Sequence, residues 1–178
     1  MTRHLRPTSW VVALFAVLVV GCGGSQVQDT PRPLATPVAS LGSALAGTAR
    51  RVTQALDAAG YQVAPPTVPY RPSEPASLTQ VPRTVLQVQG VDPDLGYVVI
   101  YQLADSAEAG VRAAELAGYL GSGFGQTNFP VDAQFSVAQA DSTVLMTWWS
   151  RERADDDDVT QGAFDVVRTI GQQYPVVK

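Results

Sequence analysis

Apolar residues recur along this chain with two different periods, and these periods predict where its helices and strands lie. A helical spacing of three or four residues marks three stretches, 40–60, 105–121 and 158–171. Each ends at a glycine, the residue that most readily adopts the left-handed conformation of a helix C-cap. The residues expected to face the core are Leu41, Leu45, Val52 and Leu56 in the first helix, Ala109, Ala113, Leu116, Ala117 and Leu120 in the second, and Val159, Ala163, Val166, Val167 and Ile170 in the third.

Capping residues are expected at the starts of the second and third helices. Asp105 stands three residues before Glu108, which is the spacing of a capping box. The third helix is expected to begin near Asp158, with Gln161 at the same spacing. A carboxylate in this place accepts a hydrogen bond from a free backbone N–H of the first turn. Both helices therefore have a defined beginning in the sequence.

Four stretches dense in β-branched and aromatic residues predict strands, at 84–89, 97–103, 134–139 and 143–149. Short turns rich in Gly, Asp, Pro and Ser join them in pairs, so we expect two hairpins. The element order is then α-ββ-α-ββ-α, and the fold class is α+β. The simplest arrangement is one four-stranded antiparallel sheet with helices on one face. The second strand is expected to be central because it is apolar on both sides.

A proline-rich segment, 64–82, separates the first helix from the first hairpin. Proline fixes φ and lacks a backbone N–H, so we expect an extended segment with no regular secondary structure. Tyr61 and Tyr70 are the expected points of contact with the core. The prolines of this segment are Pro65, Pro66, Pro69, Pro72, Pro75 and Pro82.

The N-terminal residues have the three parts of a secretory signal peptide. Arg3, His4 and Arg6 form a basic start, an apolar run covers 10–20, and the small residue Gly21 precedes a cysteine. An apolar run of this length is too short to span a bilayer, which needs about 20 residues. The chain is therefore expected to be exported.

Cys22 is the single cysteine of the chain, and with Val19, Val20 and Gly21 it resembles the lipobox of bacterial lipoproteins. The resemblance implies cleavage before Cys22 and a thioether-linked diacylglyceryl group on it. Two fatty chains, such as palmitate, anchor a protein stably because each buried methylene contributes about 0.8 kcal/mol. The implied location is the cell membrane or outer membrane, facing outside the cytoplasm. The alternative is that Cys22 is a free thiol behind an uncleaved hydrophobic anchor.

The chain is thus expected to have three parts. Residues 1–21 form the signal peptide, residues 22–38 the lipidated cysteine and a flexible tether, and residues 39–178 a single α+β domain. The tether is inferred from 23–37, which is rich in Gly, Ser, Gln, Thr and Pro and has no apolar period. Fully extended, a tether of this length reaches about 50 Å.

Charge and composition narrow the chemistry available to the mature domain. The formal net charge of the chain is −4, and loss of Arg3 and Arg6 with the signal makes it more negative, so no nucleic acid is expected as a partner. The only histidine, His4, lies in the signal, and Cys22 carries lipid. A Ser-His-Asp triad, a Cys-His pair, a His/Cys zinc site and a disulfide are therefore excluded. No cofactor or metal is expected.

The segment from Val85 to Gly118 carries a second resemblance. It contains a strand, a short turn, an aromatic-rich strand and an alanine-rich helix capped by Asp and Ser, and it is similar to small uncharacterised lipoproteins of high-GC bacteria. Lys178 is the only lysine among 12 basic residues, which agrees with a GC-rich genome. The resemblance implies a lipoprotein domain and no particular activity.

Trp148 and Trp149 are the strongest candidates for a binding surface. Adjacent strand residues point to opposite faces, so with helices on one face only, we expect Trp148 in the core and Trp149 on the open face. Beside Tyr97 or Tyr101, an exposed Trp149 would form an aromatic patch able to stack on a sugar ring or on a side chain of a partner. The alternative is that helix ends or the proline-rich segment cover this patch.

Two further patterns have simpler structural explanations. The acidic run Asp155–Asp158, with Glu152 nearby, offers carboxylates for Ca²⁺ but lacks the alternating spacing and the glycine of a calcium loop. Acidic residues before a helix are also stabilised by the helix dipole. The glycine-rich stretch 121–125 follows a helix, whereas a phosphate-binding loop follows a strand and opens a helix. It predicts a helix end and a loop.

The sequence favours a membrane-anchored envelope lipoprotein whose domain has a binding or structural role and is not an enzyme. The lipid on Cys22 would bind the membrane. The domain would bind an envelope protein or a glycan. The alternative is a cell-wall glycan hydrolase that uses acidic residues such as Glu108, Glu115 and Glu152. Such chemistry needs two carboxylates about 5 to 10 Å apart. A concave site near the tryptophan pair would favour a small ligand, and a flat one a protein partner.

Overall fold

The computed structural model describes residues 42–91, 96–154 and 156–178. Contacts within the chain set off the described residues as one compact unit. The expected signal peptide, Cys22, the tether and Leu41 lie outside the described residues. Among the described helices, none is long and apolar enough to cross a membrane.

The three expected helices are present, but the expected buried face is only partly right in the last one: Val159, Val166 and Ile170 are half-buried, and Ile170 lies beyond the helix end. All five residues predicted to be buried in the second helix are buried, and the first helix buries Leu45, Val52 and Leu56 together with Thr48. In the last helix, Phe164 and Thr160 join Ala163 and Val167 in the core. The helices are α1 (Ser43–Ala58), α2 (Ser106–Gly121), the short α3 (Gly123–Gln126) and α4 (Asp157–Arg168), with 3-10 turns η1 (Ala76–Leu78) and η2 (Arg151–Arg153).

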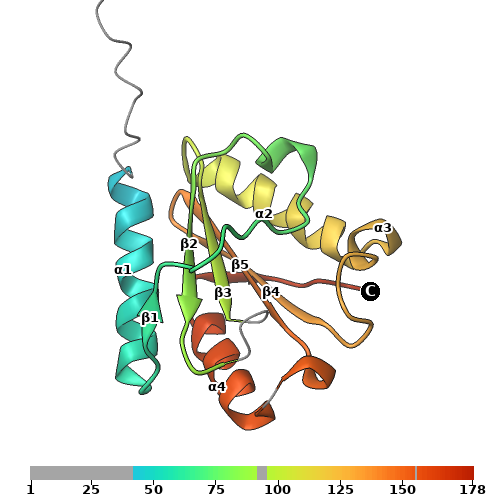
Figure 1. The fold of residues 1–178 in the computed structure, drawn as a ribbon. Coiled ribbons are helices and arrows are strands. Elements are labelled where there is room, and N and C mark those ends of the chain that lie inside the picture. Colours follow the sequence, from blue (N-terminus) through green and yellow to red (C-terminus); the bar gives the residue numbers. More distant parts are fainter. Residues whose placement is uncertain (1–41, 92–95, 155) are drawn as a thin grey trace, which may run out of the picture. The chain divides into compact units, whose positions relative to one another are not determined.

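The strands form one antiparallel sheet in the order β1-β2-β3-β5-β4-β6. Figure 1 labels the strands from β1 to β5. As predicted, the strand that begins at Tyr97 is central, because β3 lies between β2 and β5. The strands are β1 (Val63–Ala64), β2 (Arg83–Val88), β3 (Tyr97–Gln102), β4 (Gln134–Ala140), β5 (Thr143–Trp149) and β6 (Gln172–Tyr174).

The prediction of a four-stranded sheet in the order α-ββ-α-ββ-α is wrong. A short strand is added at each edge: β1 has two residues and β6 has three. Strands this short show no alternating pattern, so the sequence carries little sign of them. Pro65 follows β1 and Pro175 follows β6. Because proline donates no backbone hydrogen bond, both edge strands end there.

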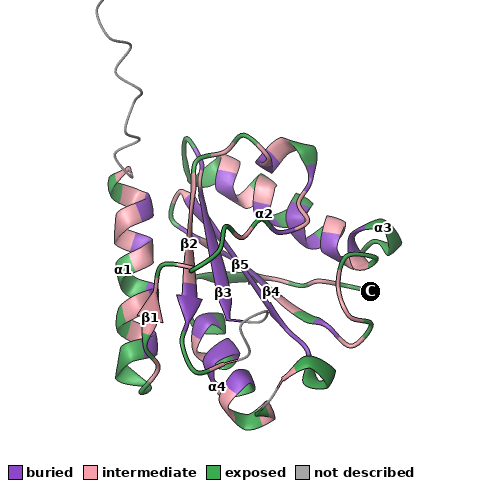
Figure 2. Ribbon diagram, viewed as in Figure 1, coloured by how far each residue is buried: buried purple, intermediate pink, exposed green. Residues whose placement is uncertain are grey.

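Helices cover both faces of the sheet, so the prediction of helices on one face is also wrong. α2 packs on one face, and α1 and α4 pack on the other (Figure 1). All seven residues of β5 are buried, and Figure 2 shows burial along the central strands. A strand that is apolar on both sides needs cover on both faces. The face under α2 carries Val99, Tyr101, Val144, Met146 and Trp148, and the face under α1 and α4 carries Val98, Ile100 and Leu145.

The helix ends follow the expected capping chemistry with one shift. Asp105 caps α2 through a 2.8 Å hydrogen bond from the first turn. The cap of α4 is Asp156, which accepts the backbone N–H of Val159 at 3.1 Å, so the helix begins earlier than the predicted start near Asp158. Gly60, after α1, has a φ of +88°, the left-handed conformation that glycine adopts without strain.

The segment between β1 and β2, residues 65–82, is called the strap below. It is extended as predicted, apart from the single turn η1. Leu78 of the strap is fully buried in the core under α2, and Tyr70 and Val81 pack against the same core. The strap therefore covers part of the sheet face that α2 covers.

Candidate functional site

The two adjacent tryptophans of β5 lie on opposite faces of the sheet, and both are buried. Trp148 is 8% exposed and belongs to the core under α2. Trp149 is 4% exposed, and its ring lies 6.1 Å from that of Phe164 in α4. The alternation agrees with the prediction, but the open face does not exist because α4 covers it. The prediction of an exposed Trp149 is therefore wrong.

The strap covers the other aromatic residues that we expected at the surface. Tyr70 of the strap stacks on Tyr97 with 3.9 Å between ring centroids and 9° between planes. The indole Nε1 of Trp148 donates a 3.0 Å hydrogen bond to the Tyr70 hydroxyl. Burial raises the pKa of Tyr70 to about 12, against the effect of that hydrogen bond. The alternative, that helix ends or the proline-rich segment cover the patch, holds: the strap covers Tyr97, and α4 covers Trp149. The prediction that Trp149 lies beside Tyr97 or Tyr101 is wrong, because both tyrosines share the face of Trp148.

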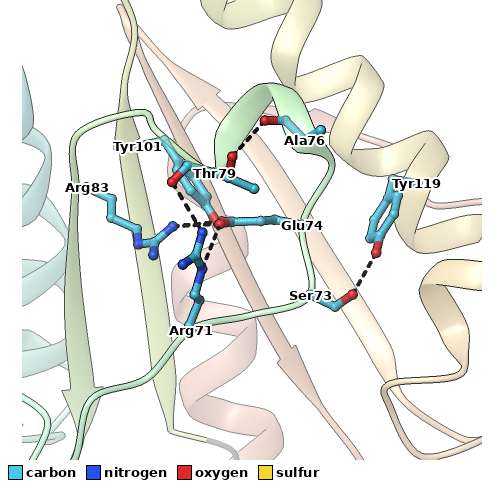
Figure 3. Close-up of polar contacts among 8 residues, drawn as sticks. All are labelled: Arg71, Ser73, Glu74, Ala76, Thr79, Arg83, Tyr101 and Tyr119. Carbon is cyan, nitrogen blue, oxygen red and sulfur yellow. Dashed lines mark hydrogen bonds and ion pairs between the residues drawn. The ribbon is translucent and has the colours of Figure 1, made fainter.

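Glu74 fixes the strap to the sheet (Figure 3). Its side chain is 2% exposed, and its two oxygens accept hydrogen bonds of 2.8 and 2.9 Å from Nη1 of Arg83 in β2. The hydroxyl of Tyr101 in β3 donates to the same carboxylate at 2.6 Å, and Arg71 Nε lies 3.4 Å away. Burial, followed by the hydrogen bond to Glu74, raises the pKa of Tyr101 far above its usual value.

A second contact ties the strap to α2. The hydroxyl groups of Ser73 and Tyr119 are 2.7 Å apart, and Asn128 Nδ2 donates to the Ser73 hydroxyl at 3.1 Å. Figure 3 shows this pair next to the Glu74 cluster. Both contacts hold the strap over the sheet. Tyr101 is fully buried beneath the strap, so it does not lie on an exposed surface.

Trp149 forms part of the wall of an open pocket of about 370 Å³, which we call the Trp149 pocket. The volume lies in the range of small-molecule sites, about 300 to 1,000 Å³. Its wall is built from the loop before β4, the paired ends of β4 and β5, η2 and the first turns of α4. The lining residues are Asp132, Gln134, Trp149, Arg151, Glu152 and Gln161.

Asp132 is the fixed carboxylate of the pocket. It accepts the Ser150 hydroxyl at 2.6 Å and the backbone N–H of Glu152 at 3.0 Å. Burial alone would raise the pKa of Asp132, but these hydrogen bonds, with one from the backbone N–H of Arg151, hold it below its usual value. Asp132 is therefore ionised and holds the η2 turn in place. Little of its acceptor capacity remains for a ligand.

Several other polar groups of the pocket have no partner among the residues that the structure describes. The side chains of Gln134, Glu152 and Gln161 form no hydrogen bond or ion pair with any other described residue. Arg151 is oriented by a 2.8 Å bond from Nε to Asp157, which leaves its terminal nitrogens for other partners. These groups can bind a ligand without breaking internal contacts.

Trp149 also carries a buried donor without a partner. Its Nε1 and the hydroxyl of Thr160 are both buried, and neither has a hydrogen bond to the described residues. Both residues line a small, partly open cavity of about 10 Å³ between β5 and α4. Buried polar groups without partners cost free energy and are uncommon in folded proteins. Trp149 therefore lines both this cavity and the open pocket.

The acidic residues considered for hydrolysis lie in two separate places. Glu108 and Glu115 lie on α2, where both form ion pairs with Arg112. The hydrogen bond from Arg112 lowers the pKa of Glu115. Only Glu152 lines the Trp149 pocket, where its neighbour is Asp132, which we did not anticipate.

The acidic run before α4 acts as a helix start. Asp156 caps the helix, Asp157 pairs with Arg151, and Asp155 lies outside the described residues. No group of acidic, histidine or cysteine side chains suited to a metal ion occurs among the residues that the structure describes.

The glycine-rich stretch is a helix end, as predicted. Gly121 closes α2 against the backbone of the C-terminal segment: a Cβ there would lie 2.1 Å from the carbonyl oxygen of Val177. Ser122 then caps the four-residue helix α3. The stretch therefore continues into a short helical turn instead of an open loop.

Sequence reasoning missed Glu74, Asp132 and Phe164. Glu74 bonds Tyr101 from 27 positions away, and Asp132 bonds Ser150 from 18 positions away, so no local pattern points to either contact. Phe164 was accessible to the sequence pattern, because it lies three positions before the buried Val167 on the same helical face.

No protein-family model matches the chain, and no curated protein or solved structure matches it either. Its function therefore has to be inferred from its own residues.

Proposed function

We propose that this protein is an envelope lipoprotein, anchored to a membrane through Cys22, whose domain binds a ligand in the Trp149 pocket without catalysis. One observation carries the binding part: polar side chains that have no partner within the described part of the chain line an open pocket of small-molecule size. The anchor is supported by the apolar run and the Val-Val-Gly-Cys motif at 19–22.

The non-catalytic proposal is supported by the hydrogen bonds of Asp132. A carboxylate that acts as a nucleophile or base needs an oxygen free to reach the substrate. Hydrogen bonds hold the pKa of Asp132 below its usual value, and its oxygens are engaged by Ser150 and by backbone N–H groups. Asp132 therefore suits the task of holding η2 in shape better than that of exchanging protons.

A glycan hydrolase remains the second candidate because two carboxylates, Asp132 and Glu152, line one pocket. In that case Asp132 would act as the nucleophile or base and Glu152 as the acid. An assay for reducing ends released from purified peptidoglycan decides between the two. We expect no release above that of a Glu152→Gln variant.

The binding proposal is tested by pull-down from detergent-solubilised envelopes with the mature lipoprotein as bait. The comparison is a double variant, Gln134→Ala with Gln161→Ala, because both residues are exposed and their loss leaves the core intact. We expect at least one envelope component that the unmodified protein retains and the double variant does not.

A matched control is Gln54→Ala with Gln80→Ala, two exposed glutamines outside the pocket. This control should retain the same components as the unmodified protein. Identical eluates from the pocket variant and the control would count against the Trp149 pocket as the binding site.

A further inference from the structure

If the Trp149 pocket binds a ligand, as proposed above, the groups that line it restrict the chemistry of that ligand. The amides of Gln134 and Gln161 each offer both donors and acceptors, Glu152 offers acceptors, and Arg151 offers donors. A hydroxyl group both donates and accepts, so a ligand with many hydroxyl groups can pair with all of these side chains at once.

The charges near the pocket disfavour an anion. Asp132 and Glu152 line the pocket together with Arg151, whose Nε is already bound to Asp157. An anionic ligand would therefore meet more negative than positive charge, in a chain that is itself acidic.

A cationic ligand is also a poor match. A polyamine cation such as spermidine offers donors only, so the terminal nitrogens of Arg151 and the amide N–H groups of Gln134 and Gln161 would face it without acceptors. Leaving donors unpaired on binding costs affinity. A neutral ligand avoids both penalties.

Trp149 does not act as a stacking platform for this ligand. The residue is 4% exposed, and its ring packs against Phe164. Aromatic stacking on a sugar needs an open ring face. Recognition in this pocket must therefore come from hydrogen bonds to the side chains around Trp149.

We propose that the Trp149 pocket binds a neutral glycan segment, through hydrogen bonds from Gln134, Arg151, Glu152 and Gln161 to its hydroxyl and acetamido groups. Asp132 is the positioning residue: it holds η2, and with it Arg151 and Glu152, through the Ser150 hydroxyl and the backbone N–H of Glu152.

The test is isothermal titration calorimetry of the mature lipoprotein in detergent micelles. The neutral probes are chitotetraose and cellotetraose, the cationic probe is spermidine and the anionic probe is tripolyphosphate. We expect binding of at least one neutral probe, with an affinity that changes less than about twofold between roughly 0.05 and 0.5 M salt, because no net charge is neutralised.

Variants separate the pocket from the rest of the surface. Gln134→Ala with Gln161→Ala should lower the affinity for the neutral probe about tenfold or more, a loss typical of hydrogen-bonding side chains. The control variant, Gln54→Ala with Gln80→Ala, should leave this affinity unchanged. Glu152→Gln should retain most of the affinity, because an amide still accepts from a hydroxyl group.

The outcomes distinguish this proposal from the one on which it rests. Salt-sensitive binding of spermidine that Glu152→Gln abolishes would overturn the glycan assignment in favour of a cation. Binding of tripolyphosphate alone would also overturn it. If no oligosaccharide binds while the pull-down still depends on Gln134 and Gln161, the pocket binds another ligand and the glycan assignment fails. If neither experiment depends on these residues, both proposals fail.

Discussion

The hydroxyl of Tyr101 donates a 2.6 Å hydrogen bond to Glu74, a carboxylate that is 2% exposed and lies 27 positions earlier in the chain. The contact joins the centre of the sheet to the proline-rich strap, and Arg83 completes it with two hydrogen bonds to the same carboxylate. Because this contact holds the strap on the sheet, the strap covers Tyr101 and its aromatic neighbours.

Removal of Glu74 should strongly destabilise the domain. Glu74→Ala leaves Arg83, which is 21% exposed, without its counter-ion and leaves the Tyr101 hydroxyl without an acceptor. We expect a loss of about 3 kcal/mol or more in the free energy of unfolding, measured with urea. Arg71→Ala is the control, since Arg71 is 58% exposed, and it should cost less than about 1 kcal/mol. Equal effects of the two variants would show that the buried contact contributes little.

The buried tyrosines predict a loss of stability in alkali. Folding raises the pKa of Tyr70 from 10 to about 12 and that of Tyr101 further, so the neutral forms are favoured in the folded state. The stabilisation of the folded state by these neutral hydroxyl groups is complete below pH 10, where the tyrosines of the unfolded chain are also neutral. For Tyr70 it is lost as the pH rises from 10, where the unfolded chain ionises, to about 12. The free energy of unfolding should fall by up to about 1.4 kcal/mol per pH unit for each tyrosine.

Tyr70→Phe and Tyr101→Phe are the corresponding variants. Each removes one titrating hydroxyl, so the slope of the unfolding free energy against pH above 10 should become smaller in both. Absorbance at the phenolate band gives the second measurement. A slope unchanged in both variants would contradict the proposed burial of these hydroxyl groups.

Both tryptophans should matter for stability. Trp148→Ala and Trp149→Ala each remove a buried ring, and we expect losses of about 3 to 5 kcal/mol in urea unfolding. If the sheet face that carries Trp149 were open, Trp149→Ala would lower the free energy of unfolding much less than Trp148→Ala. A small effect of Trp149→Ala would mean that α4 does not cover it in solution.

Local patterns predicted much of the fold. The face of α2, the β5 strand and the opposite orientations of Trp148 and Trp149 follow from spacing alone, because helical and strand periods act over a few residues. Edge strands β1 and β6 are too short for such a pattern.

The cover over the tryptophan pair could not be predicted in the same way. It depends on where α4 and the strap pack, and their contacts join residues far apart in the chain: Trp148 bonds Tyr70 from 78 positions away. The apolar character of both sides of β5 was the signal for two-sided cover. The pocket beside Trp149 follows from the same long-range packing, so only Trp149 and Glu152 of its residues were candidates beforehand.

The cap of α4 offers a local test. Asp156→Ala removes the acceptor of the Val159 N–H and should cost about 1 kcal/mol in the free energy of unfolding. Asp158 lies in the first turn without a capping bond, so Asp158→Ala should cost only a few tenths of a kcal/mol through the helix dipole. The reverse order would place the helix start two residues later.

The proposed anchor is tested at Cys22. Acylation of the cysteine precedes cleavage in the lipoproteins that the N-terminal motif resembles, so Cys22→Ala should accumulate as an uncleaved precursor without labelled fatty acid. The readouts are metabolic labelling with palmitate and the size of the membrane-associated protein. Normal labelling of the variant would refute the assignment of Cys22.

The most direct test of the Trp149 pocket uses the indole N–H signals in a ¹H–¹⁵N NMR spectrum of the full chain in micelles. With Trp10→Phe, only Trp148 and Trp149 contribute, and Trp149→Phe assigns the two signals. The Trp148 N–H is bound to the Tyr70 hydroxyl under the strap, whereas that of Trp149 has no partner among the described residues. On titration with a soluble envelope digest, and then with chitotetraose, the Trp149 signal should shift while the Trp148 signal stays in place. A Trp149 signal that stays unchanged with both additions, or a shift of Trp148 alone, would contradict a ligand site at the Trp149 pocket.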